Sequence, residues 1–533
     1  MTSASSILRS LLIYSICVPL ALFLGYIIAQ EGNPIYNPFT YFAIIPVLLL
    51  LALPLLLRWH HSLLIICWNL TAVLYFLPGR LDLWTGVAWL SLSLAVIQYI
   101  LNRRLRFLSA PSVTRSLLFL GAVVFATAEC RGGFGVAAFG SAVQGAKRYF
   151  VLFSAIIGYF ALISRPIPTR YATKLVVLFL LGSAVAAIGD LGSILPESFY
   201  FIYLLFPISQ YGLYTIIGNN PGVQVGAIAR LGGVALASCS VYYAMLARYG
   251  IEQIFAPRHI FRMLVFISLI GLSSVGGFRG NAVTFLLLFS LLFYLEGLLR
   301  SRLLPVFAVL TILVATLLVA FAQQLPLNVQ RTLSVLRLPV SNEVKDDAQS
   351  SSQWRLNIWK RVVPQIPHYL LIGKGLGINA AEMQAIITVS PNTGLSDAGE
   401  EWTEMAADYH SGPLSVIVPF GIAGVIGFLW FLAASYGVLK KNYLYGNPAY
   451  TKLNRFLLAY FITKAIIFFA IFGNLYSDLA GFVGIVGLSI SLNAGVARPF
   501  ILLPPARLRV RRRMLPKGIR RPLPAHAGLA HTV

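Results

Sequence analysis

His410 stands at an abrupt change in the chain. The segment DYHSGPLSVIVPFGIAG (408–424) is polar and acidic up to this histidine and then becomes a long apolar span. A neutral imidazole near pH 7 can take a proton from a hydroxyl group as that hydroxyl attacks. Asp408 and Asp478, the latter at the start of the last apolar span, are further acid/base, orienting or substrate-binding candidates. The alternative for His410 is an ordinary place at a helix entry.

Basic residues at the mouths of apolar spans form the second group of candidates. Arg230 lies just inside an apolar run, and Arg279 separates two runs in SSVGGFRGNAVTF. A guanidinium near hydrocarbon is costly unless it is paired or faces water, so each is a functional candidate. Snorkelling to lipid phosphates is the alternative for any single one. The group on this predicted outer side comprises Arg80, Arg131, Lys147, Arg148, Arg230 and Arg279.

The stretch QWRLNIWKRVVPQ adds Arg355, Lys360 and Arg361, on an amphipathic helix predicted at about 353–366. Arg355 and Trp359 are four residues apart and share a helix face, which suits a surface lying on a bilayer. Arginine forks match phosphate oxygens bidentately, and a diphosphate needs more than one fork. A lipid-linked diphosphate therefore fits both the charge and the predicted location. An ordinary amphipathic helix with solvated charges is the alternative.

The elements that must position these residues are membrane helices. The chain has 533 residues, 58% of them hydrophobic and 11% charged, with a mean hydropathy of +0.80; soluble domains have about 25% charged residues. Apolar runs long enough to cross a ~30 Å hydrocarbon core recur throughout. We expect an all-α polytopic membrane protein with about fourteen transmembrane helices, at 10–29, 39–57, 61–78, 83–101, 115–128, 149–164, 171–190, 227–247, 260–277, 281–298, 303–321, 413–437, 454–473 and 478–497.

Lysine and arginine in the short loops predict the orientation, with both termini cytoplasmic. The formal charge of +24 is explained by these loops and the tail, so it does not indicate nucleic-acid binding. The tail RLRVRRRMLPKGIRRP is expected to contact anionic membrane lipids. The inner clusters are Arg103, Arg104 and Arg106; Arg165 and Arg170; Arg258 and Arg262; Arg300 and Arg302; Lys440 and Lys441.

Four parts of the chain follow from this topology. They are helices 1–11 (1–321), a large, partly helical extracytoplasmic loop (322–412), helices 12–14 (413–497) and a basic cytoplasmic tail (498–533). The loop holds nine of the seventeen acidic residues and ends at His410. Long ordered loops are usually functional. The four cysteines show no zinc-ligand spacing, so no metal or other cofactor is expected.

A resemblance covers roughly residues 225 to 435. An arginine at the outer mouth of a late helix pair (Arg279) is followed by R-x-x-x-W (Arg355, Trp359) and G-x-G (Gly373, Gly375). H-S-x-x-L and G-x-x-G close the pattern (His410, Ser411, Leu414, Gly421, Gly424). The combination resembles the bacterial O-antigen ligase and O-antigen polymerase family.

The resemblance implies a metal-independent, inverting glycosyltransferase of the bacterial inner membrane, with its active site facing the periplasm and an undecaprenyl-diphosphate-linked glycan as donor. Arg279 and Arg355 match the family's diphosphate-binding arginines, and His410 matches its catalytic histidine. Ligase and polymerase remain open, as does the acceptor: lipid A–core, a growing glycan or a protein hydroxyl. The further candidate substrate-binding residues are Arg230, Arg131, Lys147, Arg148, Arg361, Asp408 and Asp478.

A transporter or lipid flippase is the alternative from another class. Lys464, in LLAYFITKAIIFFAIFG, is a charge in mid-span and favours it. A buried lysine paired with a polar neighbour, or tied structurally to Asp478, is the alternative for this residue. A transporter predicts internal repeats, and none is convincing in this sequence. A flippase also has no need of a long outer loop with a histidine at its foot.

Overall fold

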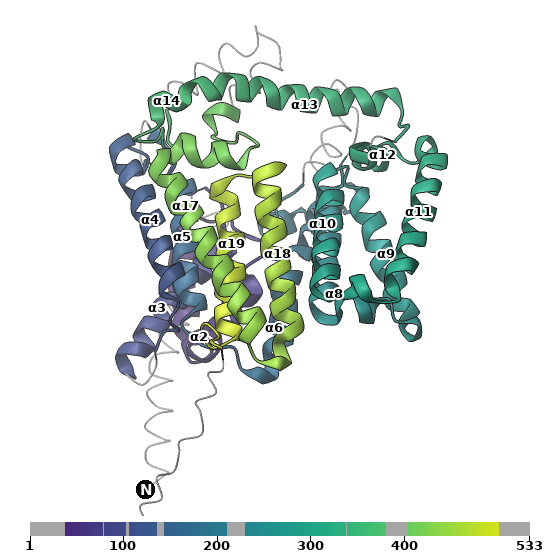
Figure 1. Cartoon of the computed structure of the whole chain (residues 1–533). Helices are drawn as coiled ribbons and strands as arrows, with labels where there is room; N and C mark the ends of the chain where they lie inside the picture. The colour runs from purple at the N-terminus through teal and green to yellow at the C-terminus, as the bar shows by residue number, and fades with distance from the viewer. Residues whose placement is uncertain are drawn as a thin grey trace, which may run out of the picture. The chain divides into compact units, whose positions relative to one another are not determined.

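The computed structural model describes residues 38–77, 79–102, 106–135, 143–209, 230–336, 338–379 and 403–499. Over these residues the chain is mostly helical, with two short two-stranded sheets, β1–β2 and β3–β4 (Figure 1). Eight helices in this part of the chain are long and apolar enough to cross a membrane, and α10 and the end of α2 are shorter apolar helices.

The elements run in chain order as α2 (Pro38–Cys67), β1 (Val73–Leu74), β2 (Leu81–Asp82), α3 (Leu83–Leu101), α4 (Pro111–Arg131), β3 (Val143–Gln144), α5 (Ala146–Leu162), η3 (Thr169–Tyr171), α6 (Ala172–Leu181), η4 (Gly182–Ser193), η5 (Glu197–Leu204), α8 (Gly232–Ile254), η6 (Pro257–His259), α9 (Ile260–Ser274), α10 (Arg279–Leu295), η7 (Leu298–Arg300), α11 (Leu303–Phe321), η8 (Ala322–Gln324), α12 (Leu327–Leu333), η9 (Ser334–Leu336), α13 (Asn342–Val362), η10 (Val363–Gln365), α14 (Ile366–Tyr369), β4 (Ile378–Asn379), α17 (Gly412–Tyr445), η11 (Pro448–Tyr450), α18 (Thr451–Ala470) and α19 (Leu475–Leu492).

Most predicted spans have a helix at their position, and one pair is wrong. The predicted spans 39–57 and 61–78 are one helix, α2, which ends at Cys67; the chain then enters the β1–β2 hairpin. Helix α6 continues as the tighter η4. The predicted amphipathic helix at 353–366 is the second half of the longer α13. The span at 10–29 and the tail beyond residue 499 lie outside the described residues, so the count of about fourteen stays a prediction.

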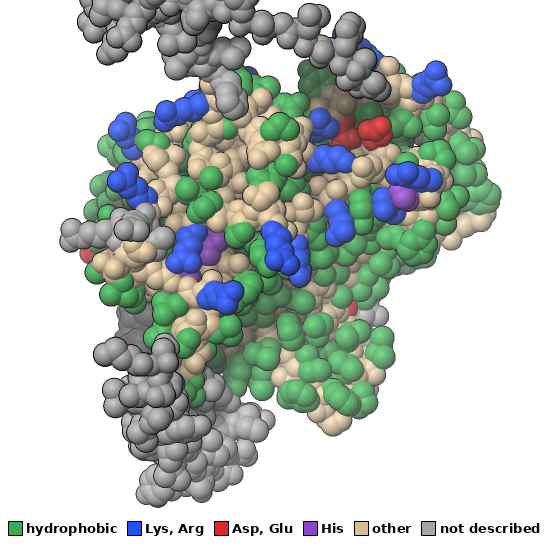
Figure 2. Space-filling model, turned by 90° about the horizontal axis from the view of Figure 1, so that it is seen from below, with side chains coloured by type: hydrophobic (Ala, Val, Ile, Leu, Met, Phe, Trp, Pro, Cys, Tyr) green, Lys and Arg blue, Asp and Glu red, His purple; other side chains and the backbone are tan. Residues whose placement is uncertain are grey.

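The candidate residues and the inner basic clusters lie at opposite ends of the helices. Arg279 begins α10, whereas Arg300 follows its end. His410 precedes α17, whereas Lys440 and Lys441 lie in its last turns. The face seen from below carries many Lys and Arg side chains (Figure 2). This separation is the one that a positive-inside topology requires.

The segment 370–375 hydrogen-bonds to the backbone of α17 at a kink in that helix. Gly421 has φ 62° and ψ −162°, and it follows Pro419 inside the helix. Backbone groups that leave the helical pattern at such a kink need other partners. The segment 370–375 supplies them: Lys374 N donates to Val418 O (2.8 Å), Gly375 N to Pro419 O (3.0 Å), and Ile422 N to Leu370 O (2.8 Å).

We expect Gly373→Ala to destabilise this contact. A Cβ at Gly373 would lie 1.9 Å from Pro419 O, so the backbone must move. Such overpacking costs about 1–3 kcal/mol, measurable as a lower midpoint of thermal unfolding in detergent. Gly437→Ala is the control. Gly437 lies in α17, the helix that contains Pro419, and nothing lies within 4 Å of its Cβ position. Equal midpoints for the two variants would contradict the expectation.

Helix α13 bridges two groups of helices. It lies across the ends of the upright helices (Figure 1). Near its start, Asp347 pairs with Arg331 of α12. Near its end, Ile358 and Val362 are buried, and Trp359 Nε1 donates to Tyr409 O (2.8 Å). Helix α13 thereby brings Arg355 to the residues before α17.

Candidate active site

A cavity of about 1140 Å³ lies beside α13. It brings together three of the predicted site residues, each from a different part of the chain: Arg230 before α8, Arg355 of α13 and His410 before α17. The remaining lining residues are Phe278, Asp346, Asp347, Gln349, Ser350, Ser351, Gln353, Trp354 and Asn357. The surface of this cavity therefore combines guanidinium, carboxylate, amide, hydroxyl and imidazole groups.

The hydrogen bond of His410 defines its tautomer. Nδ1 lies 3.0 Å from the backbone carbonyl oxygen of Asp408 and 3.4 Å from Asp408 Oδ1. A carbonyl oxygen only accepts, so Nδ1 carries the proton in the neutral ring and Nε2 keeps its lone pair. Trp354 and Phe472 contact the imidazole edge-on, with ring centroids 5.0 and 5.1 Å away. The ring is thus held with its basic nitrogen available.

Arg355 presents a concentrated positive charge to the cavity. Its Nε is buried and has no hydrogen-bond partner among the described residues. Burial, and secondarily the nearby Arg331, lowers the pKa of Arg355 from its usual value. A guanidinium crowded by another cation and short of acceptors is stabilised by an anion. The site is therefore electrostatically suited to a phosphate group.

Arg331 organises the arginines without lining the cavity. It is buried and donates to Asp347 and to Gly277 O (2.6 Å). Asp347 lies 3.7 Å from Arg230 as well, so one carboxylate joins two arginines. Arg279 Nη2 donates to Ala348 O of α13 (3.4 Å), and Arg279 is not among the lining residues.

The other predicted residues lie away from the cavity lining. Arg131 donates to Gly373 O (2.9 Å) and Ile372 O (3.1 Å), and Lys147 Nζ to Arg80 O (3.4 Å). Arg361 is exposed near the end of α13. Arg148 contacts the ring of Tyr476. As substrate-binding residues these four remain predictions.

Asp478 and Lys464 contact each other. Asp478 Oδ1 lies 2.7 Å from Lys464 Nζ. The lysine that favoured transport therefore has an acidic partner one helix away. Asp408, by contrast, lies directly beside His410.

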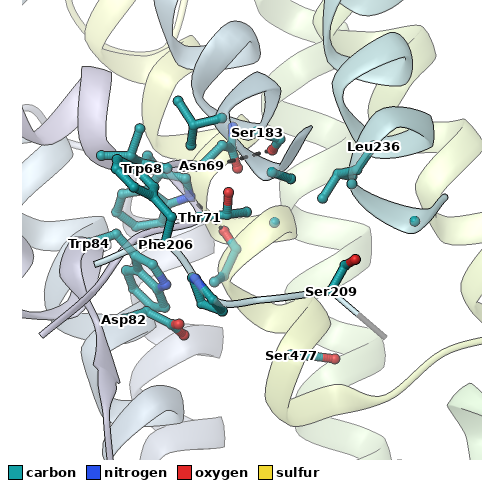
Figure 3. A pocket seen from close by; sticks show the side chains of 18 of the residues that line it. Trp68, Asn69, Thr71, Asp82, Trp84, Ser183, Phe206, Ser209, Leu236 and Ser477 are labelled. Carbon is teal, nitrogen blue, oxygen red and sulfur yellow. Dashed lines mark hydrogen bonds between the residues drawn. The ribbon is translucent and has the colours of Figure 1, made fainter. Parts of the chain in front are cut away.

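A second cavity, of about 530 Å³, is lined by Trp68, Asn69, Trp84, Asp82, Ser477 and Lys464, among others (Figure 3). Burial raises the pKa of Asp82 from its usual value. Ser477 belongs to the first turn of α19, as does Asp478. The described residues include no group of three or more His, Cys, Asp or Glu placed to hold a metal ion.

Sequence reasoning missed Arg331, Asp347 and Asn474. Trp354 was placed on the predicted amphipathic helix, on one face with Arg361, but was not assigned to the site. Arg331, Asp347 and Asn474 contact partners far along the chain. Arg331 and Gly277, for example, are 54 residues apart. No spacing in the sequence signals those contacts.

A comparison with protein-family models gives a match within the chain. The family model described as O-antigen ligase matches residues 260–429. The matched segment contains Arg279, Arg355 and His410, and it ends before Lys464 and Asp478. No curated protein matches the chain.

Proposed function

From the premise that residues 260–429 belong to the O-antigen ligase family, we propose that this multi-pass membrane protein is a glycosyltransferase using an undecaprenyl-diphosphate-linked donor. It transfers the glycan to an acceptor hydroxyl at the periplasmic face of a bacterial inner membrane. The observation that carries the proposal is the single cavity lined by Arg230, Arg355 and His410.

The arginines stabilise the leaving group. As the bond between the anomeric carbon and the phosphate oxygen breaks, negative charge grows on the departing undecaprenyl diphosphate. Arg230 and Arg355 contact the diphosphate in the cavity, and Arg279 adds positive charge from its position against α13. Preorganised charge of this kind usually contributes more than any other effect to lowering the barrier of such reactions.

His410 acts on the acceptor. Nε2 takes the proton of the acceptor hydroxyl while its oxygen attacks the anomeric carbon from the face opposite the leaving group. Asp408, next to Nδ1, stabilises the imidazolium that forms. The products are an inverted glycosidic bond and undecaprenyl diphosphate.

A reconstituted assay tests the proposal. Purified protein in liposomes is given an undecaprenyl-diphosphate-linked glycan and lipid A–core, and glycan transfer and free undecaprenyl diphosphate are measured. Equal amounts of both products are expected. Loss of the gene distinguishes two outcomes: unligated long lipid-linked chains indicate a ligase, and single repeat units a polymerase. Movement of the donor across the bilayer with no new glycosidic bond would contradict the proposal and favour a flippase.

A further inference from the structure

The turn that carries His410 has an unusual backbone conformation and is contacted by a side chain at the start of another helix. Ala407 and His410 both have positive φ, 51° and 49°, a region that residues other than glycine rarely adopt. Asn474, which is buried, donates its side-chain amide to Asp408 Oδ1 (3.2 Å) and to Ala407 O (3.5 Å). Its Oδ1 caps α19 by accepting from Tyr476 N (3.4 Å). Asn474 therefore joins this turn to the start of α19.

The Lys464–Asp478 ion pair fixes the position of Asn474. Its backbone N–H donates to Asp478 Oδ2 (3.0 Å), and Asp478 N donates back to Asn474 O (2.9 Å). Lys464 of α18 donates to the other carboxylate oxygen, Oδ1, at 2.7 Å. A continuous series of contacts therefore runs from Lys464 through Asp478, Asn474 and Asp408 to the imidazole of His410.

This series extends from one cavity to the other. His410 lines the larger cavity. Lys464, with Ser477 and Gly481, lines the second cavity shown in Figure 3. A Cβ at Gly481 would lie 2.4 Å from Lys464 Cε, so the glycine leaves the lysine room to reach Asp478.

We propose that Asn474, Asp478 and Lys464 are positioning residues for the glycosyl transfer: they hold Asp408 in place and thereby keep His410 oriented with Nε2 as its basic nitrogen. This inference rests on the proposed function. A catalytic imidazole needs its second nitrogen fixed, because that bond sets both tautomer and ring orientation. The ion pair has no direct contact with the imidazole, so its effect passes through Asn474.

The first test removes the links. Asn474→Ala and Asp478→Asn are expected to lower kcat about 10- to 100-fold, the usual cost of losing an orienting partner, while KM for the donor stays near the wild-type value. Asp478→Glu, which keeps the charge, is expected to recover part of the loss. Gly481→Ala, which displaces Lys464 without removing a charge, is expected to have a smaller effect in the same direction.

The matched control is Asn454→Ala. Asn454 is a buried asparagine of α18 that donates to Asn442 O (3.0 Å) and Asn493 Oδ1 (2.9 Å) at the other end of the same helices. Its loss should lower the unfolding temperature and leave kcat of the folded protein unchanged. If Asn454→Ala lowered kcat as much as Asn474→Ala does, the positioning role would be overturned.

A second readout does not depend on glycan transfer. Diethyl pyrocarbonate modifies neutral imidazole, so its rate at His410, followed by peptide mass spectrometry across pH, reports the protonation of that ring. Asn474→Asp keeps an acceptor for α19 but adds a negative charge beside Asp408, which should favour the protonated imidazole. The modification curve and the acid limb of kcat should both move to higher pH.

Several charged groups surround the His410 ring. They are Asp408 on its own turn, Arg230, Asp346, Asp347 and Arg355 across the cavity, Arg148 near Asp408, and the Lys464–Asp478 pair.

The outcomes separate the two proposals. If transfer depends on His410 but Asn474→Ala and Asp478→Asn keep wild-type kcat and Asn474→Asp leaves the modification curve in place, the positioning role is wrong and the glycosyltransferase proposal stands. If neither the wild type nor any variant transfers glycan, the proposed function fails. The positioning contacts are then tested separately, and they are overturned if Asn474→Asp leaves the pH dependence of His410 modification unchanged.

Discussion

Replacing His410 with Asn should lower kcat for glycan transfer about 10²- to 10⁴-fold, the contribution typical of a general base. Asparagine is the informative substitution because it tolerates positive φ, which His410 has at 49°. The variant can therefore keep the backbone of the turn while losing the basic nitrogen. KM for the donor should change little, since the diphosphate contacts are made by arginines.

The control for His410→Asn is His368→Ala. His368 lies in α14, is exposed and does not line the cavity. Its loss should leave transfer at the wild-type rate. Near-normal kcat in His410→Asn, with the protein correctly inserted, would show that another group takes the proton and that the assigned base is wrong.

Hydropathy predicted most of the helices for a physical reason. Backbone polar groups in hydrocarbon must bond within the segment, so a long apolar run between charged loops has few alternatives to a helix. The O-antigen ligase resemblance was readable because Arg279, Arg355 and His410 stand in short motifs, and the family match at 260–429 confirms it. That resemblance, together with the positions of these residues, indicated the side chains that lie in and beside one cavity.

The span predicted at 61–78 is helical only as far as Cys67, because tertiary contacts hold the following residues in another conformation. After α2 ends, Asn69 Nδ2 donates to Phe179 O (2.8 Å) and Val73 N donates to Leu205 O (2.8 Å). These partners come from the end of α6 and the end of η5, more than a hundred residues along the chain. Hydropathy counts only the residues of the segment itself, so it could not detect them.

The supports of the site were hidden for the same reason. Arg331 and Asn474 are single polar residues with no motif around them, and their function appears only when Asp347 and Asp408 are placed beside them. For Lys464 the sequence left transport and a structural tie to Asp478 open, and the ion pair with Asp478 on the next helix confirms the tie. Charged groups within membrane spans generally pair with one another, and Lys464 follows that rule.

Replacing Arg355 with Ala should lower kcat/KM about 10²- to 10³-fold, the usual effect of removing one preorganised group that stabilises developing charge. Arg355→Lys keeps the charge but loses the bidentate fork, so it should recover only part of the rate. Inorganic pyrophosphate provides a second measurement: it should inhibit the wild type and inhibit Arg355→Ala more weakly. Both readouts test contact with a diphosphate directly.

Lys345→Ala is the control for Arg355→Ala, since it removes a positive charge from the same helix at an exposed position outside the cavity lining. If the net charge of α13 were all that mattered, kcat/KM would fall equally in both variants, and pyrophosphate inhibition would weaken in both. A loss confined to Arg355 would instead require a guanidinium at that one position. Such a requirement is expected because Arg355 lines the cavity and its planar guanidinium can bind a diphosphate through two parallel hydrogen bonds.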